Sequence, residues 1–144
     1  LCFTFADTVL TTKLIDGTFP DYQRVIPTEN NNILQVSSDA FRQAVDRVST
    51  VSADKTRSVK MRISGEVMTL SASSTDSASG EETLEVSYNG SDIEIGYNAR
   101  YLMDVASQID GETIEFALAD SALPTVIRNP GDDANLFVLM PMRV

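Results

Sequence analysis

The sequence predicts an α+β fold in which two helices lie on one face of antiparallel β-sheets. Much of the 144-residue chain falls into short segments of alternating polar and apolar residues, the pattern of half-buried strands. Two other segments carry an apolar stripe at helical spacing. The order strand, helix, strand, strand, strand occurs twice, and Phe41 and Val45 in the first unit match Tyr101 and Val105 in the second. We therefore expect an internal duplication of a β-α-β-β-β unit.

The N-terminal part precedes the duplicated region. Alternation predicts strands at residues 2–5 and 9–15, which would pair with an upstream segment, so we expect the sequence to begin inside a larger protein. Two consecutive turns follow, and residues 23–27 are expected to be extended. This composition is that of a linker between domains. We expect the linker to pack against the chain that follows, because it contains the apolar residues Phe19, Tyr22, Val25 and Ile26.

The first repeat unit is expected between residues 33 and 88. Its helix should begin at the good N-cap residues 37–39 and continue to about Val51. The apolar stripe of this helix consists of Ala40, Phe41, Ala44, Val45, Val48 and Val51. Strands are expected at residues 33–36, 59–63, 67–73 and 81–88.

The second unit starts after the turn dipeptide Asn89-Gly90. Asn98 is the expected N-cap of a helix over residues 99–109, whose apolar stripe consists of Tyr101, Leu102, Val105 and Ile109. The Tyr101 ring could therefore be mostly core. Pro141 cannot donate to a ladder, so the last strand should stop there and leave residues 142–144 on a rim. Strands are expected at residues 93–96, 113–118, 125–128 and 136–140.

The composition limits what the protein can do. A hydrophobic content of 42% in 144 residues is enough for a packed core of one domain, or of one domain with a fragment of another. The sequence shows no membrane-spanning run and no targeting signal, and we expect a soluble protein. A net charge of −10 disfavours tight binding of phosphate by the whole surface. A single cysteine excludes an internal disulfide and fits a reducing compartment.

Catalysis is not expected. The sequence has no histidine, the commonest general base and metal ligand, and no nucleophile elbow or phosphate-binding glycine loop. The pairs Glu81-Glu82 and Asp132-Asp133 lack the spacing of a calcium loop and are interpreted as solvated charges. We therefore expect no cofactor, no metal site and no catalytic residue.

Two stretches differ from ordinary core or loop sequence. Residues 19–27 and 137–144 both combine proline, aliphatic and aromatic side chains with one arginine, Arg24 or Arg143. Exposed methionine beside proline makes an adaptable apolar surface. If the two stretches meet, they form a groove for an extended peptide with hydrophobic anchors and an acidic or carboxylate group. A buried last strand is the alternative for residues 136–140.

Three segments resemble the bacterial DNA polymerase III beta subunit, the replication sliding clamp. They are DGTFPDYQRVIP at residues 16–27, IGYN followed by YLMDV at residues 95–105, and VLMPMRV at residues 138–144. The resemblance covers the whole chain in order, and its Met-Pro-Met-Arg ending is highly specific. It implies the DNA-clamp fold, with residues 1–27 as the end of the middle domain plus the interdomain linker and residues 28–144 as the C-terminal domain.

The resemblance also implies a function. Members of this family form a head-to-tail homodimeric ring that encircles duplex DNA in the cytoplasm, so an acidic surface is tolerable. A hydrophobic groove on the ring takes short motifs of DNA polymerase subunits, the clamp loader and repair proteins. By matching position, the groove residues would be Pro20, Arg24, Val25, Asn98, Tyr101, Ala122, Pro124, Val138, Met140, Pro141, Met142 and Arg143.

The dimer interface follows from the same resemblance. It would use Thr50 and Val51 at the end of the first helix, and the strand that carries Glu81, Glu82 and Glu85. From the residues alone, this strand could equally be an edge protected by charge. The arginines 42, 47 and 100 belong to or flank helices that would face DNA, but solvated arginines explain them as well.

Two other function classes stay open from the residues alone. A stand-alone acidic adaptor domain that binds peptides would show the same apolar stretches. A hydrolase or metal-dependent enzyme would need a ligand set that the sequence does not contain.

Overall fold

The computed structural model of this chain describes residues 1–19, 21–51, 58–74, 78–132 and 134–143. The N-terminal part contains the hairpin β1 (Cys2–Phe5) and β2 (Thr8–Thr11) and the 3-10 helix η1 (Tyr22–Arg24). The first unit contains β3 (Asn32–Ser37), α1 (Ser38–Val51), β4 (Ser58–Ser64), β5 (Val67–Ser73), β6 (Ser79–Glu85) and β7 (Ser87–Tyr88). The second contains β8 (Ile93–Asn98), α2 (Ala99–Ala106), β9 (Thr113–Leu118), β10 (Thr125–Arg128) and β11 (Leu136–Leu139).

The two units exchange strands to build two antiparallel sheets. The four-stranded sheet has the order β6-β5-β4-β8, and the five-stranded sheet has the order β11-β10-β9-β3-β7. Each unit therefore gives its first strand to the sheet formed by the other unit: β3 pairs with β9, and β8 pairs with β4. The duplicated β-α-β-β-β unit that the sequence predicts is confirmed, and neither unit completes its sheet alone.

Both helices form where the sequence has an apolar stripe at helical spacing and a residue that can cap the helix N-terminus. The stripe on α1 is buried at Phe41, Ala44, Val45 and Val48. At the start of α2, the Asn98 Oδ1 atom accepts hydrogen bonds from the backbone N–H groups of Arg100 at 2.9 Å and Tyr101 at 3.4 Å. No helix in the described ranges is long and apolar enough to cross a membrane.

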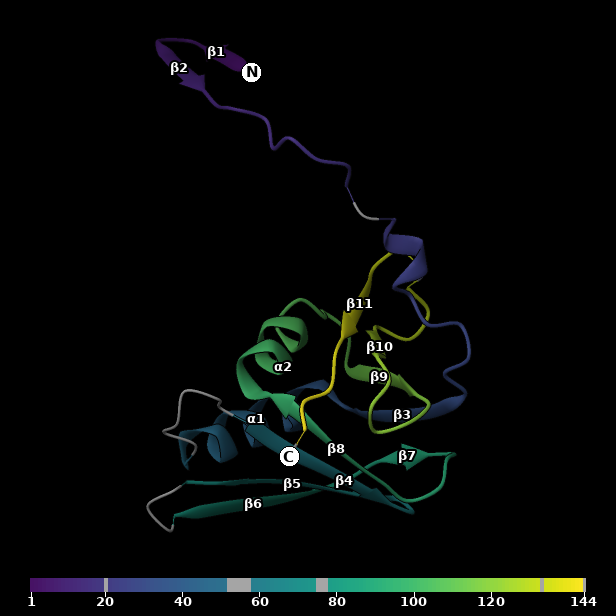
Figure 1. Cartoon of the computed structure of the whole chain (residues 1–144). Helices are drawn as coiled ribbons and strands as arrows, with labels where there is room; N and C mark the ends of the chain where they lie inside the picture. The colour runs from purple at the N-terminus through teal and green to yellow at the C-terminus, as the bar shows by residue number, and fades with distance from the viewer. Residues whose placement is uncertain (20, 52–57, 75–77, 133, 144) are drawn as a thin grey trace.

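The core lies between the helices and the two sheets. The rings of Phe41 on α1 and Phe116 on β9 meet edge to face with centroids 5.2 Å apart. Fully buried side chains from both sheets, such as Met61, Leu70 and Ile114, complete it. Burying each side chain of this size contributes roughly 1.5–3 kcal/mol. In Figure 1 the two helices lie together on the left of the duplicated region, with β9, β10 and β11 to their right and β5 and β6 below them.

The N-terminal part differs from expectation. All of residues 1–19 are exposed, and Figure 1 shows the β1–β2 hairpin standing away from both sheets. Tyr22 and Val25 are also exposed, and only Ile26 and Pro27 are half-buried. The expected packing of this linker against the following chain is therefore wrong for most of its apolar residues. The expected extended segment at residues 23–27 begins instead with η1, which Asp21 caps through a bond from the Gln23 N–H at 3.2 Å.

Most element boundaries agree with expectation to within two residues, but three elements differ further. The second strand ends at Thr11 rather than at residue 15. The helix α2 ends at Ala106, although Ile109 in the following turn stays buried. The expected strand over residues 81–88 is divided at Val86, because β6 belongs to one sheet and β7 to the other. Its apolar residues Leu84, Val86 and Tyr88 are half-buried and pack against the core, and their alternation with exposed residues continues through the change of sheet.

Candidate functional site

Two surface depressions lie along the C-terminal tail, defined here as residues 136–143. The first, the α2 depression, has a volume of about 380 Å³ and is lined by Tyr101, Asp104, Val105, Val138, Leu139 and Met140. The second, the β8 depression, has a volume of about 540 Å³ and is lined by Glu94, Gly96, Ser121, Ala122, Pro141, Met142 and Arg143. The same tail therefore forms a wall of both depressions.

The α2 depression is apolar and accessible. Tyr101 is 56% exposed and Met140 is 58% exposed, so neither side chain is part of the hydrophobic core. The expectation that Tyr101 could be mostly core is wrong, because its neighbour Leu102 takes the buried position on α2. An exposed ring beside a thioether and valine side chains provides a deformable apolar surface. This surface is suited to an aliphatic or aromatic anchor of a partner.

The tail is fixed by one backbone contact after its strand has ended. The Met142 N–H donates to the Gly96 carbonyl oxygen at 2.8 Å, which forms an isolated antiparallel bridge to β8. The expected free rim is therefore wrong for Met142, which is half-buried, while residue 144 lies outside the described residues. Ser87 makes the matching contact in the first unit, because it follows β6 and pairs with Gln35 on β3. The tail thus repeats the crossover between sheets seen after β6.

The β8 depression is more polar than the α2 depression. Glu94 forms a surface ion pair with Lys60 at 3.0 Å. Arg143 is exposed and forms no ion pair with any other described residue. A guanidinium in this position is available to a carboxylate of a bound molecule.

The loop that forms the other wall of the β8 depression is held from several sides. The Asp120 Oδ1 atom accepts from the Ala122 N–H at 3.1 Å, which closes a turn. The Asn30 Nδ2 group donates to the carbonyl oxygens of Ala117 at 2.9 Å and Pro124 at 2.8 Å. These bonds join the end of β9 to the start of β10 and place Ala122 beside the tail.

A buried hydroxyl pair joins the two sheets close to this loop. The Tyr97 phenol on β8 and the Thr125 hydroxyl on β10 are 2.6 Å apart, and both residues are buried. Burial raises the pKa of Tyr97 well above its usual value, so the phenol stays protonated. Each hydroxyl is the hydrogen-bond partner of the other in an otherwise apolar region.

The structure brings together most of the predicted groove residues. Tyr101, Ala122, Val138, Met140, Pro141, Met142 and Arg143 line the depressions. Asn98 and Pro124 lie beside them in the chain, Asn98 as the cap of α2 and Pro124 as a half-buried neighbour of Thr125. Arg24 and Val25 line neither depression, and Arg24 forms an exposed ion pair with Asp21 at 3.3 Å. Pro20 lies outside the described residues.

Several lining residues were not predicted from the sequence. Glu94 and Gly96 reach the site only because the tail folds back onto β8. Asp104 and Val105 could have been found, because they follow Tyr101 at helical spacing. Leu139 lies between the predicted residues Val138 and Met140. Ser121 adjoins Ala122 and carries no distinctive signal.

The predicted interface residues lie at one edge of the four-stranded sheet. β6 is an edge strand, as expected, with Glu81 and Glu85 on its exposed face. Glu82 points to the opposite face and is paired with Arg47 of α1. Thr50 is exposed, and Val51 covers Gly80 so closely that a Cβ added there would lie 2.9 Å from the Val51 Cγ2 atom.

The helix arginines are already engaged within the chain. The Arg42 Nη1 group donates to the carbonyl oxygens of Ala106 at 3.0 Å and Ile109 at 3.3 Å, which caps the end of α2. Arg47 is bound to Glu82, and Arg100 lies 4.0 Å from Asp104. None of these three arginines is an unpaired cation.

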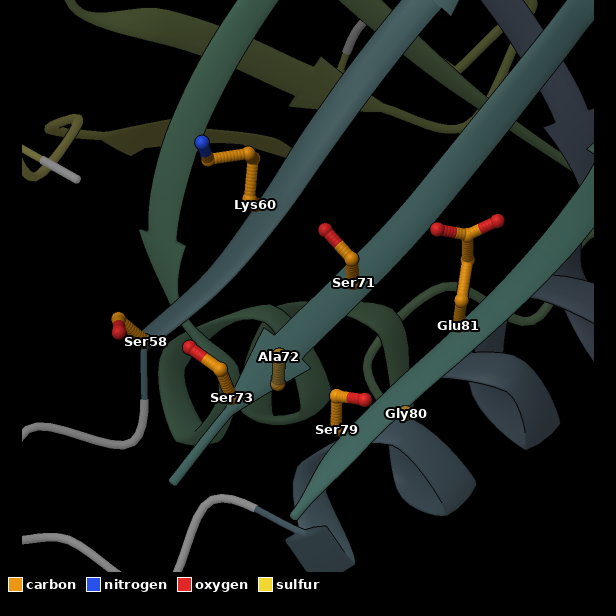
Figure 2. Close-up of a pocket in the computed structure, with 8 residues that line it drawn as sticks. All are labelled: Ser58, Lys60, Ser71, Ala72, Ser73, Ser79, Gly80 and Glu81. Carbon is orange, nitrogen blue, oxygen red and sulfur yellow. The ribbon is translucent and has the colours of Figure 1, made fainter. Parts of the chain in front are cut away.

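A third depression lies on the outer face of the four-stranded sheet. Figure 2 shows Lys60, Ser71 and Glu81 standing on the same face of β4, β5 and β6, where they are cross-strand neighbours. Other serine hydroxyls surround them. The ammonium group of Lys60 forms an ion pair with Glu94, so it is not an unpaired cation. Across the described residues, no cluster of three or more His, Cys, Asp or Glu side chains could hold a metal ion.

Comparison with known proteins identifies relatives along nearly the whole chain. Residues 23–143 match the family model of the DNA polymerase III beta subunit, C-terminal domain. The beta sliding clamp of Caulobacter vibrioides (strain NA1000 / CB15N) is 49% identical over 142 residues, which cover 99% of this chain and 38% of the relative. The beta sliding clamp of Escherichia coli (strain K12) is 34% identical over 138 residues, covering 96% of this chain and 38% of the relative.

Solved structures agree with this result. The beta sliding clamp of Caulobacter crescentus, solved with PEG bound, superposes with a TM-score of 0.90 at 49% identity and covers 94% of this chain and 37% of that one. The DnaN sliding clamp of Bartonella birtlesii bound to griselimycin gives a TM-score of 0.92 at 45% identity, covering 99% and 38%. The 144-residue chain thus spans less than two fifths of the length of these relatives.

Proposed function

Because this chain belongs to the DNA polymerase III beta subunit family, we propose that it is part of a DNA sliding clamp, a non-catalytic processivity factor of DNA replication. In this proposal residues 28–144 are the C-terminal clamp domain. Residues 1–27 are the end of the middle domain with the interdomain linker. The exposed apolar hairpin β1–β2 supports this division, since its side chains have no cover in the described chain.

The observation that best supports the proposal is the pair of depressions along one tail. An extended peptide laid across them would place an apolar anchor against Tyr101 and Met140, and an acidic or carboxylate group near Arg143. Partners of this chemistry are the clamp-binding segments of DNA polymerase subunits, the clamp loader and repair proteins. Arg24, Val25 and Pro20 would complete the groove with the middle domain in the longer protein.

A ring-shaped assembly explains how a protein whose chain has a net charge of −10 can stay on DNA. A clamp that encircles the duplex as a homodimer is retained topologically and does not depend on neutralising phosphates. Thr50, Val51 and the edge strand with Glu81 and Glu85 would form the contact between subunits, and Glu82 would support it through Arg47. The protein would work in the cytoplasm, where replication takes place, and would need no cofactor.

Peptide titration tests the proposal directly. A fluorescent pentapeptide rich in leucine and phenylalanine is titrated into this chain and into a chain lacking residues 140–144. The full chain should bind saturably, and the shortened chain should not. Arg143→Glu is the matched point variant, because it leaves the Met142 bridge intact and should weaken a peptide that carries a carboxylate.

Two results would contradict the proposal. One is undiminished binding by the shortened chain while circular dichroism shows that it is folded. The other is no binding to the full chain at millimolar peptide together with no binding to a longer chain that includes the preceding domain.

A further inference from the structure

Three consecutive residues of β8 each hold a different segment in or next to the proposed peptide site. The Gly96 carbonyl accepts from the Met142 N–H and fixes the tail. The Tyr97 hydroxyl bonds to Thr125 at 2.6 Å. The Asn98 side chain caps α2 through the N–H groups of Arg100 and Tyr101. Residues 96–98 therefore connect the tail, β10 and α2.

The Tyr97–Thr125 bond links two strands whose neighbouring residues line the β8 depression. β8 belongs to the four-stranded sheet and carries Glu94 and Gly96 on one wall of this depression. Thr125 begins β10 in the five-stranded sheet, directly after the loop whose residues Ser121 and Ala122 form another wall of the same depression. A hydrogen bond between the two strands therefore restrains the distance between the two walls.

The bond is sensitive to the loss of either partner. Tyr97 is 0% exposed and Thr125 is 1% exposed, so water cannot replace a lost hydroxyl without a structural opening. Removing one hydroxyl leaves the other buried without a partner, whereas removing both leaves an apolar contact of similar shape. The loop can relieve an orphaned Thr125 hydroxyl by moving outward, since residues 121–123 are exposed.

We propose that Tyr97 and Thr125 are positioning residues for peptide binding, which set the width of the β8 depression through their hydroxyl–hydroxyl bond. This inference rests on the proposed function for its peptide, but the effect on the loop is a property of the free chain. Partners that extend into the β8 depression then depend on this bond, whereas a group that occupies only the α2 depression does not.

The test compares Tyr97→Phe, Thr125→Val and the double variant with the unaltered chain. Amide hydrogen exchange is measured by NMR in the free protein. In Tyr97→Phe, exchange at Ala122 and Leu123 should rise about tenfold more than at the amides of β5, which report general stability. The double variant should return these rates to within about twofold of the unaltered chain.

A titration with the Leu- and Phe-rich pentapeptide gives the second readout. Amide shifts at Ser121, Ala122 and Arg143 report on the β8 depression, and those at Tyr101 and Met140 report on the α2 depression. Tyr97→Phe should weaken binding about fivefold and reduce the β8 shifts selectively, and the double variant should restore both.

The outcomes separate the two proposals. Exchange at Ala122 and Leu123 that rises no more than at β5 overturns the positioning role, whatever the peptide does. A single variant that binds as the unaltered chain does, or a double variant that is not rescued, also overturns it. If neither the unaltered chain nor a longer chain that includes the preceding domain shows peptide shifts while the exchange pattern is as expected, the proposed function fails and the restraint on the loop stands.

Discussion

The guanidinium of Arg47 and the carboxylate of Glu82 meet at two points, with 2.7 Å between Nε and Oε1 and 3.1 Å between Nη2 and Oε2. This two-point contact ties α1 to the edge strand β6. The hydrogen bond to Arg47 lowers the pKa of Glu82, and the bond to Glu82 raises the pKa of Arg47. Glu82 is therefore paired, whereas Glu81 and Glu85 form no ion pair with another residue that the structure describes.

This ion pair predicts a pH-dependent effect of Glu82→Gln. Because the folded-state pKa of Glu82 lies below its unfolded value of about 4.3, the pair stabilises the fold above that pH. The contribution is lost as the pH falls through the folded-state pKa. Thermal unfolding should show a lower Tm for Glu82→Gln at pH 7 and a smaller difference from the unaltered chain at about pH 3. Glu81→Gln is the control and should change little at either pH. An equal loss at both pH values for Glu82→Gln would contradict the prediction.

Arg42→Ala should destabilise the domain through α2. Its guanidinium caps the carbonyl oxygens of Ala106 and Ile109 and also binds Asp39 at 3.0 Å. Losing these charge-assisted bonds should cost about 1–2 kcal/mol in the free energy of unfolding. Arg100→Ala removes only an exposed pair with Asp104 and should cost less than about 0.5 kcal/mol. Urea denaturation measures both values, and similar values for the two variants would show that the cap contributes little.

The helix boundaries show what periodicity can and cannot predict. The stripe at Leu102, Val105 and Ile109 predicts burial correctly at Leu102 and Ile109, but α2 ends at Ala106. A turn of similar pitch continues the stripe, so the apolar pattern does not mark the end of the helix. Likewise, alternation through Val86 predicts the inward side chains, but it does not reveal that the strand passes from one sheet to the other.

The site was predictable where its residues are close in sequence and not where a long-range contact assembles it. The tail residues 138–143 stand out by composition, and Asn98 stands out as a cap. Glu94 joins them through the Met142 bridge to Gly96, which no local pattern encodes. Conversely, apolar composition suggested that Tyr22 and Val25 would be covered, yet both are exposed, because composition does not say which segment provides the cover.

Asn30→Ala should loosen the wall of the β8 depression. The side-chain amide donates to two backbone carbonyls, of Ala117 and Pro124, and is partly buried. Its removal leaves both acceptors without this donor and should lower the free energy of unfolding by about 1–3 kcal/mol. Asn31→Ala is the matched control, because Asn31 is exposed and its bond to another described side chain uses the backbone carbonyl, which accepts from Asn89. Chemical denaturation of the two variants distinguishes them, and equal stability would mean that water replaces the amide.

If the α2 depression takes an apolar anchor, as proposed, Tyr101→Ala should weaken peptide binding and leave the stability of the fold nearly unchanged. The ring is 56% exposed, so its removal should change the free energy of unfolding by less than about 1 kcal/mol. A bound anchor would lose the face of the ring, and peptide affinity should fall about tenfold. Tyr101→Phe keeps that face and should bind within about twofold of the unaltered chain. Fluorescence titration and thermal unfolding of both variants test this. If Tyr101→Ala binds the peptide normally, the anchor does not lie on α2, and the contact must come from the tail side of the depression.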